Sequence, residues 1–248
     1  MIRTLQDVAT AFQFLTRLPL GRLAYDPDAL SRSAKFFPLV GLVIGTLGAA
    51  LYQWLVPHWP AMVVALLAVI FFVLVTGGLH EDGLADAADA FGGGWNREQI
   101  LTILKDSRIG SFGTLAIVFS VASRLLLLPN LPIGHFTAYV ISAQVLCRWT
   151  ALPLGYVLPG ARESSGQGAR IARQISGVSL TVGTLLAAAI VGCTLRGAML
   201  GPMLSVLIVT AASGLYYWRR IGGITGDCFG ATNQLAEIMV YLCGAFHR

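Results

Sequence analysis

The feature that most constrains this chain is a series of uncharged or nearly uncharged apolar segments, each close to the length that crosses a lipid bilayer. A spanning helix needs about 20 predominantly apolar residues. The windows that approach this length are 39–56, 61–79, 109–123, 125–147 with a continuation to 160, 174–195, 197–218 and 228–246. The pattern predicts an all-α fold, a polytopic transmembrane helical bundle of about seven spans, with residues 1–248 forming a single integral membrane domain.

The third and fourth windows are the least regular, because Arg124, Pro129, Pro132 and Arg148 interrupt them. A charged side chain inside an apolar segment is costly unless it is paired or lines a wet cavity. A long side chain near a helix end can instead snorkel to the membrane surface. We therefore expect each of Arg124 and Arg148 to be paired with another group, to line a wet cavity or to reach the membrane surface.

The composition agrees with a membrane protein and excludes several other classes. Only 12% of the residues are charged, against about 25% in soluble proteins, and the mean hydropathy is +0.72. These values exclude a disordered chain, an ordinary cytosolic enzyme and a disulfide scaffold. The four cysteines are scattered, which predicts neither a metal site nor a disulfide. The net charge of +5 favours contact with anionic lipid of the bilayer, and we expect no nucleic-acid partner.

The positions of the basic residues predict the orientation. Lys and Arg gather in the first segment, around 97–108, at 162–173 and at 219–220, whereas the 57–60 turn carries no formal charge. Because cytoplasmic loops are enriched in Lys and Arg, an amino terminus inside the cell places every cluster in the cytoplasm. Residues 1–35 then form a cytoplasmic or interfacial segment, whose apolar stripe Val8, Ala11, Phe12 and Leu15 suits the membrane interface.

The most informative segment is acidic and directly follows an apolar window. Glu81, Asp82, Asp86 and Asp89 lie within nine residues. At about 100° per residue, the three aspartates share one narrow face of a helix, Glu81 points about 100° away, and His80 lies on the face opposite Asp82. Like charges on one helix face repel one another. We therefore expect a cation beside Asp82, Asp86 and Asp89.

The donor types favour a hard divalent cation, Mg2+ with Mn2+ as the alternative, because the cluster offers carboxylate oxygens and lacks cysteine. Mg2+ usually takes one or two carboxylates together with waters and substrate phosphate oxygens, so the cluster predicts a phosphate-bearing substrate. The alternative interpretation is a solvated acidic helix end that stabilises the helix dipole.

Two further segments suit the same site. Residues 105–111 offer the cations Lys105 and Arg108 together with hydroxyl groups, which bind phosphate oxygens, although Lys105 alone is equally typical of a cytoplasmic flank. Residues 222–230 open the last window with glycine-rich backbone, which suits anion binding at a helix N-terminus, and Asp227 within them is a further metal ligand. Glycine and threonine are also frequent where membrane helices pack closely.

These motifs carry a family resemblance. The segments 80–86 (HEDGLAD) with Asp89, 106–110 (DSRIG) and 225–227 (TGD) resemble those of adenosylcobinamide-GDP ribazoletransferases, also called cobalamin synthases. The segments 14–19 (FLTRLP) and 37–41 (FPLVG) are similar to the same family, so the resemblance covers nearly the whole chain. It implies a multi-pass, Mg2+-dependent enzyme of the bacterial or archaeal plasma membrane that joins adenosylcobinamide-GDP to alpha-ribazole, or to its 5'-phosphate, and releases GMP.

The resemblance and the residue chemistry together give a set of expected roles. Asp82, Asp86, Asp89 and Asp227 are expected metal ligands, and Asp89 or Asp106 is the expected general base. The expected phosphate- or substrate-binding residues are Lys105, Arg108, Arg17, Thr225 and Gly226. The carboxylate-rich site is expected at the cytoplasmic membrane interface, and the glycine-rich spans permit a homo-oligomer.

Two other functions share part of this pattern. A CDP-alcohol phosphotransferase also uses a membrane carboxylate cluster with Mg2+, but Ala87 stands where its motif requires arginine. A cation transporter could use intramembrane carboxylates. Transporters commonly show internal repeats, and none is visible here.

Overall fold

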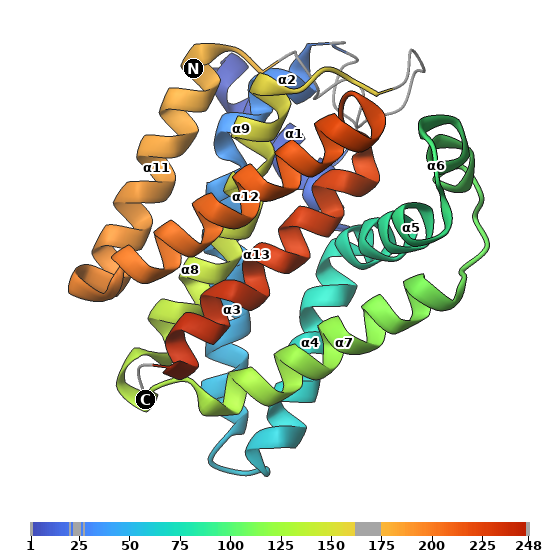
Figure 1. Cartoon of the computed structure of the whole chain (residues 1–248). Helices are drawn as coiled ribbons and strands as arrows, with labels where there is room; N and C mark the ends of the chain where they lie inside the picture. The colour runs from blue at the N-terminus through green and yellow to red at the C-terminus, as the bar shows by residue number, and fades with distance from the viewer. Residues whose placement is uncertain (1, 20, 22–25, 27, 162–174, 247–248) are drawn as a thin grey trace.

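The computed structural model of the chain describes residues 2–19, 21, 26, 28–161 and 175–246, and these ranges are built from helices (Figure 1). The α-helices are α1 (Ile2–Leu15), α2 (Ala29–Ser33), α3 (Phe37–Leu55), α4 (Ala61–Thr76), α5 (Leu79–Gly93), α6 (Arg97–Ile103), α7 (Ser111–Leu127), α8 (Phe136–Trp149), α9 (Ala151–Val157), α11 (Gly177–Leu195), α12 (Leu200–Ile221) and α13 (Gly226–Phe246). The predicted basic cluster of Arg162, Arg170 and Arg173 lies outside the described residues.

Within the described ranges, four helices are long and apolar enough to cross a membrane: Ala29–Leu55, Ser111–Asn130, Gly177–Ala198 and Leu200–Ile221. The pair Ala61–Thr76 and Leu79–Gly93 passes the same criteria together, but it is bent by 89°. The count is therefore four or five, against the expected seven or so. Window 125–147 is broken by a 3-10 helix at Leu128–Asn130, and α8 has only 14 residues. Helix α13 has 21 residues but is not apolar enough, since buried polar side chains interrupt it.

Two consecutive glycines produce the sharp bend between α4 and α5. Gly77 and Gly78 have φ of +67° and +70°, in the left-handed region where a side chain is strained. Their N–H groups donate to the carbonyl oxygens of Leu74 and Val73, which closes the C-terminus of α4. Helix α5 therefore starts in a new direction directly after an apolar helix.

Helix α13 occupies the centre of the molecule, where it contacts α5, α7, α8 and α12 (Figure 1). Helix α8 lies between α3, α11 and α13. A Cβ on Gly41 of α3 would overlap the backbone carbonyl of Gln144, and one on Gly45 would lie 2.8 Å from the Cα of Ile141. Glycine thus permits the close packing of α3 on α8, as is common between membrane helices.

The apolar stripe of α1 packs on the helical bundle, so the expectation that it faces the membrane interface is wrong. Ala11 and Leu15 are buried in the main apolar core, whereas Leu5 is exposed. The buried carboxylate of Asp7 forms ion pairs with Arg32 at 3.3 Å and Lys35 at 3.2 Å. These pairs fasten α1 to the segment that precedes α3.

A buried ion pair joins α5 to α7. Arg124, which is 1% exposed, donates from Nη1 to Glu81 Oε1 at 2.9 Å. The same oxygen lies 3.4 Å from Gln234 Nε2, and Ser120 donates to Gln234 Oε1 at 2.7 Å. The expectation that Arg124 needs a partner is confirmed, and Glu81 lies on a different side of α5 from its aspartates.

Removal of one member of this pair is expected to destabilise the protein strongly. Arg124→Met leaves the Glu81 carboxylate without its countercharge, and breaking a buried pair costs about 3–5 kcal/mol. The double variant Arg124→Met/Glu81→Gln removes both charges and should recover most of the loss. Denaturant unfolding in detergent micelles measures both values. A single variant within about 1 kcal/mol of the unaltered protein would contradict the inferred coupling.

Candidate active site

A small pocket with polar and apolar walls lies where α5 and α13 meet α8. Its volume is about 160 Å³, and its polar side chains are His80, Asp82, Arg148, Thr150, Asp227 and Asn233. Apolar side chains of α1 and α3 close one side. Two carboxylates and a guanidinium therefore face a space that is large enough for a phosphate group and far too small for a nucleotide.

A glycine contact brings the two carboxylates to this pocket. A Cβ on Gly83 would lie 3.0 Å from the carbonyl oxygen of Asp227 and 3.1 Å from the Cα of Gly230. A Cβ on Gly230 would in turn lie 3.1 Å from the Cα of Gly83. The backbones of α5 and α13 approach so closely here that a Cβ on either glycine would require the helices to shift by a few tenths of an ångström. Asp82 and Asp227, each close in sequence to one of these glycines, therefore face the same space.

His80 lines the same pocket as Asp82 although the helical period places it on the opposite face of α5. Relative to Asp82, Gly83 lies at about 100° and His80 at about 160° around the helix. The pocket covers this whole arc because Gly83 has no side chain to fill it. The helical period therefore gave the face of His80 but not its place in the pocket.

The remaining aspartates of α5 lie beside the pocket rather than in its wall. The negative charges of Asp82, Asp227 and Asp89 all repel that of Asp86. Coulomb repulsion of this kind is strong where the surroundings exclude water. The structure thus gathers the four aspartates into one region of negative potential, while Glu81 is turned toward Arg124.

Asp89 links α5 to the start of α7. Its Oδ2 accepts the N–H of Gly110 at 2.6 Å, and its Oδ1 accepts the N–H of Gly113 at 2.8 Å. Both N–H groups belong to the first turn of α7, which lacks intrahelical acceptors. Asp89 therefore caps α7 and holds the preceding loop against α5.

That loop carries the other expected polar residues. Arg108 donates from Nη2 to Asp106 Oδ2 at 2.6 Å, and its Nε lies 3.0 Å from Asp106 Oδ1. These hydrogen bonds lower the pKa of Asp106 from 3.8 to about 2. Arg108 is largely exposed and Lys105 is also exposed, and neither lines the pocket of Asp82.

The expected residues at the start of α13 are close to the pocket. Gly226 lines it, and Thr225 Oγ1 lies 3.2 Å from Asp227 Oδ2. The same hydroxyl accepts the N–H of Cys228 at 3.5 Å, near the first turn of the helix. Thr225 thus fixes the side chain of Asp227 and the helix terminus together.

Arg17 lies apart from this group. Its N–H donates to the carbonyl oxygen of Val75 at 2.8 Å, and its side chain covers Gly77 at the bend between α4 and α5. It lines a different, apolar hollow together with Leu18 and Leu74. Arg17 therefore lies at the α4–α5 bend and does not line the pocket that contains Asp82.

The carboxylates suit a hard cation in their chemistry. In the part of the chain that the structure describes, no three His, Cys, Asp or Glu side chains converge on one point as a complete ligand set would. Mg2+ does not require such a set, since it is commonly held by one or two carboxylates plus waters and substrate phosphates. Asp82 and Asp227 supply that number of carboxylates, and the residues fit a cation whose coordination the substrate completes.

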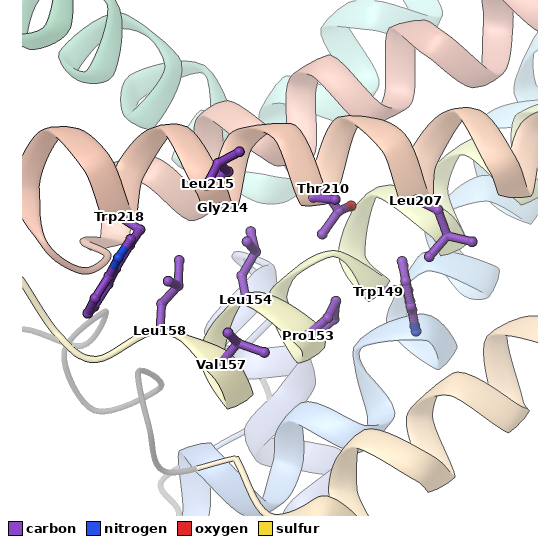
Figure 2. Close-up of a pocket in the computed structure, with 11 residues that line it drawn as sticks. Trp149, Pro153, Leu154, Val157, Leu158, Leu207, Thr210, Gly214, Leu215 and Trp218 are labelled. Atoms are coloured by element: carbon purple, nitrogen blue, oxygen red, sulfur yellow. The ribbon is translucent and has the colours of Figure 1, made fainter.

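A second, larger cavity of about 520 Å³ lies between α12 and the α8–α9 segment (Figure 2). Trp149 and Trp218 lie at its opposite ends, and the side chains between them are almost entirely apolar. It contains no ionisable group that could stabilise charge. Size alone therefore does not identify the reactive site, and the smaller pocket has the relevant chemistry.

Arg148 and Asn233, like His80 and Thr150, are polar residues of the pocket that were not assigned to it from the sequence. Arg148 interrupts an apolar window, which signals a need for a partner or a wet cavity, but not which one. Asn233 follows Asp227 by six residues on α13 and lines the pocket with it. Arg148 reaches the aspartates because α8 packs on α13, and this packing is not visible in the sequence.

The fold and the pocket together define a helical membrane protein with an acidic site suited to phosphate chemistry. Comparison with known families is more specific: residues 7–245 match the family model described as cobalamin-5-phosphate synthase. The chain belongs to this family. The resemblance noted from the separate motifs is thereby confirmed.

Curated relatives cover nearly the full length. A protein of Shewanella amazonensis named adenosylcobinamide-GDP ribazoletransferase is 35% identical over 246 residues, 97% of this chain and 95% of its own. A protein of the same name from Polaromonas sp. is 37% identical over 268 residues, 96% of this chain and 95% of its own. No solved structure matches the chain.

The glycine contact yields a first test of the site. Gly230→Ala places a Cβ 3.1 Å from Gly83 Cα and 3.2 Å from the His80 carbonyl, so α5 and α13 must separate. Overpacking of this kind costs about 1–3 kcal/mol. We expect a lower melting temperature in detergent and a reduced rate of GMP release. The matched control is Gly201→Ala on α12, where nothing lies within 4 Å; equal effects of the two substitutions would refute the importance of the contact.

Proposed function

We propose that the pocket at the α5–α13 crossing is where this cobalamin synthase transfers cobinamide phosphate from adenosylcobinamide-GDP to alpha-ribazole or its 5'-phosphate. The observation that carries the proposal is the meeting of Asp82 and Asp227 in one pocket, in a chain matched by the family over residues 7–245. Both carboxylates belong to motifs on which the family resemblance depends.

The bond changes follow from the substrates. A ribose hydroxyl oxygen of the ribazole attacks the phosphorus linked to cobinamide, and the bond from that phosphorus to the bridging oxygen breaks. GMP leaves with the bonding electron pair, and the hydroxyl proton passes to a base. In such transfers a protein mainly aligns the reacting groups and stabilises developing charge.

Asp82, Asp86, Asp89 and Asp227 form the proposed site for Mg2+, with Mn2+ as the alternative. The bound cation would neutralise charge on the pyrophosphate and on the leaving GMP. Asp82 and Asp227 are best placed, because they line the pocket. Asp89 already accepts one N–H on each oxygen, which leaves each oxygen one lone pair for a cation.

Cationic and polar groups around the pocket are proposed to hold phosphate oxygens. Gly226 and Thr225 are at the N-terminus of α13, where backbone N–H groups favour an anion. Lys105 and Arg108 lie in the exposed loop that Asp89 ties to α5. We propose that they, and Arg17 at the neighbouring bend, bind GMP or phosphate oxygens outside the pocket.

The general base is proposed to be Asp89 or Asp106. Asp106 is a weak base, because the hydrogen bonds from Arg108 favour its ionised form and hold its pKa at about 2. Asp89 accepts two backbone N–H groups from the start of α7.

We also propose a plasma-membrane location with the pocket near the cytoplasmic face and about seven crossings. The nearly continuous α8–α9 segment and α13 would supply the crossings beyond the four or five that are apolar enough by themselves. Both are central helices whose polar residues face protein rather than lipid. Such burial removes the need for an apolar surface.

The activity is tested by GMP release from adenosylcobinamide-GDP and alpha-ribazole phosphate, with purified full-length protein in detergent. We expect release with Mg2+, loss of at least about a hundredfold with EDTA, and recovery on adding Mg2+ back. A corrinoid product must appear in step with GMP. Full activity in EDTA would reject the metal proposal while leaving the transfer reaction intact.

Loss of a pocket carboxylate is expected to act on activity more than on stability. Asp82→Asn and Asp227→Asn remove negative charge from the proposed cation site, and we expect rates to fall at least about a hundredfold with a higher Mg2+ requirement. Asp28→Asn, at an exposed carboxylate beside α2, is the control and should remain active. Unchanged Mg2+ dependence in both pocket variants would exclude Asp82 and Asp227 as ligands.

The pH dependence distinguishes the two candidate bases. A group with a pKa of about 2 stays ionised across the assay range, so titration of Asp106 cannot produce an acid limb between about pH 5 and pH 9. Asp106→Asn should therefore keep the shape of the kcat/KM profile, whereas Asp89→Asn should flatten any acid limb. Loss of that limb in Asp106→Asn alone would assign the base to Asp106.

A further inference from the structure

Arg148 is a buried cation with an unused hydrogen-bond donor in the wall of the pocket. It is 3% exposed and lines the pocket with Asp82 and Asp227. Its Nη1 donates to the Gln144 carbonyl oxygen at 3.0 Å and to Gln144 Oε1 at 2.7 Å. Its Nε is buried and makes no hydrogen bond.

The partners that Arg148 does have are neutral. Among the described residues, no carboxylate lies within ion-pair distance of its guanidinium. Gln144 Nε2 donates to Glu237 at 2.9 Å, so the Gln144 side chain lies between the arginine and this carboxylate. Glu237 is under the electrostatic influence of both Arg124 and Arg148. Arg148 therefore acts on Glu237 through Gln144 and forms no direct ion pair within the described part of the chain.

An unpaired buried guanidinium is costly, because it stays protonated and loses its hydration. Gln144 orients it, and the close packing of α3 at Gly41 fixes the backbone that carries Gln144. Arg148 thus combines an oriented charge, an unpartnered donor and a place in the wall of a phosphate-sized space, which is the arrangement expected for anion binding. Arg124 also has an unpartnered donor, but it forms a direct ion pair with Glu81 and does not line the pocket.

We propose that Arg148 binds a non-bridging oxygen of the pyrophosphate of adenosylcobinamide-GDP. This assignment rests on the proposed function, and it makes Arg148 a substrate-binding residue opposite the carboxylates. The carboxylates of Asp82 and Asp227 by themselves would repel a pyrophosphate. A cation held by these carboxylates would attract the pyrophosphate, and the guanidinium of Arg148 would attract it from another wall of the pocket. The pocket volume of about 160 Å³ admits a phosphate, while the corrinoid, guanosine and ribazole rings stay outside.

The proposal predicts an effect confined to the pyrophosphate-bearing substrate. In Arg148→Met we expect the KM for adenosylcobinamide-GDP, and the inhibition constant of inorganic pyrophosphate with Mg2+, to rise at least about tenfold. The KM for ribazole phosphate should stay within about twofold. Arg148→Lys keeps the charge but lacks the fork of donors, and should be intermediate.

Arg219→Met is the matched control, because it removes an exposed cation near the end of α12 that does not line the pocket. It should leave the pyrophosphate inhibition constant unchanged. The assignment would be overturned if Arg148→Met raised the KM for adenosylcobinamide-GDP and the KM for ribazole phosphate equally. It would also be overturned if the inhibition constant of pyrophosphate stayed unchanged in this variant. If Arg148→Met does not fold, Arg148→Lys gives the same comparison. Absence of GMP release by the unaltered protein would instead reject the proposed function.

Discussion

The direct contact of two backbones at Gly83 and Gly230 is the constraint on which the site depends. Because neither residue has a side chain, α5 and α13 approach until Cα and carbonyl atoms would touch any added Cβ. Asp82 and Asp227 are thereby held in one pocket although they are far apart in sequence. The bend at Gly77 and Gly78 is the second requirement, because it directs α5 across α13 immediately after an apolar helix. A side chain at the crossing would separate the carboxylates and fill the middle of the pocket at the same time.

The buried charges around this crossing are arranged in two groups with different consequences. Glu81 and Arg124 form a direct ion pair that joins α5 to α7, and Arg124 also acts electrostatically on Glu237 of α13. Arg148 is held by the neutral groups of Gln144, so its charge is available at the pocket. Water is scarce among buried helices, and electrostatic interactions are correspondingly stronger there than at a protein surface. The same acidic helix therefore has one side that serves structure and another that can serve a charged substrate.

Much of this organisation could be predicted from the sequence, and the failures have identifiable causes. Apolar length located the helices α3, α7, α11 and α12, and the spacing of Asp82, Asp86 and Asp89 placed them together on a helix. The expected count of about seven spans relied on uncharged length, which does not detect the break at Leu128–Asn130 or the bend after Thr76. The helical period also did not reveal that His80 belongs to the pocket, because the breadth of the pocket depends on Gly83 and on a helix from elsewhere in the chain. Arg148 was identifiable as anomalous but not as part of the site, since its neighbours come from α5 and α13.

The small size of the polar pocket limits how the reaction can be organised. If the reaction takes place there as proposed, the space of about 160 Å³ would admit phosphates but not the rings of the substrates. The rings would then be recognised on surfaces outside the pocket, and the chemistry within it would need only alignment and charge. The loop that follows α6 is suited to the nucleotide side, because Asp89 fixes it to the same helix that carries Asp82. Movement of this loop would alter the capping of α7 and the environment of Asp89 together, which physically links substrate binding outside the pocket to a carboxylate beside it.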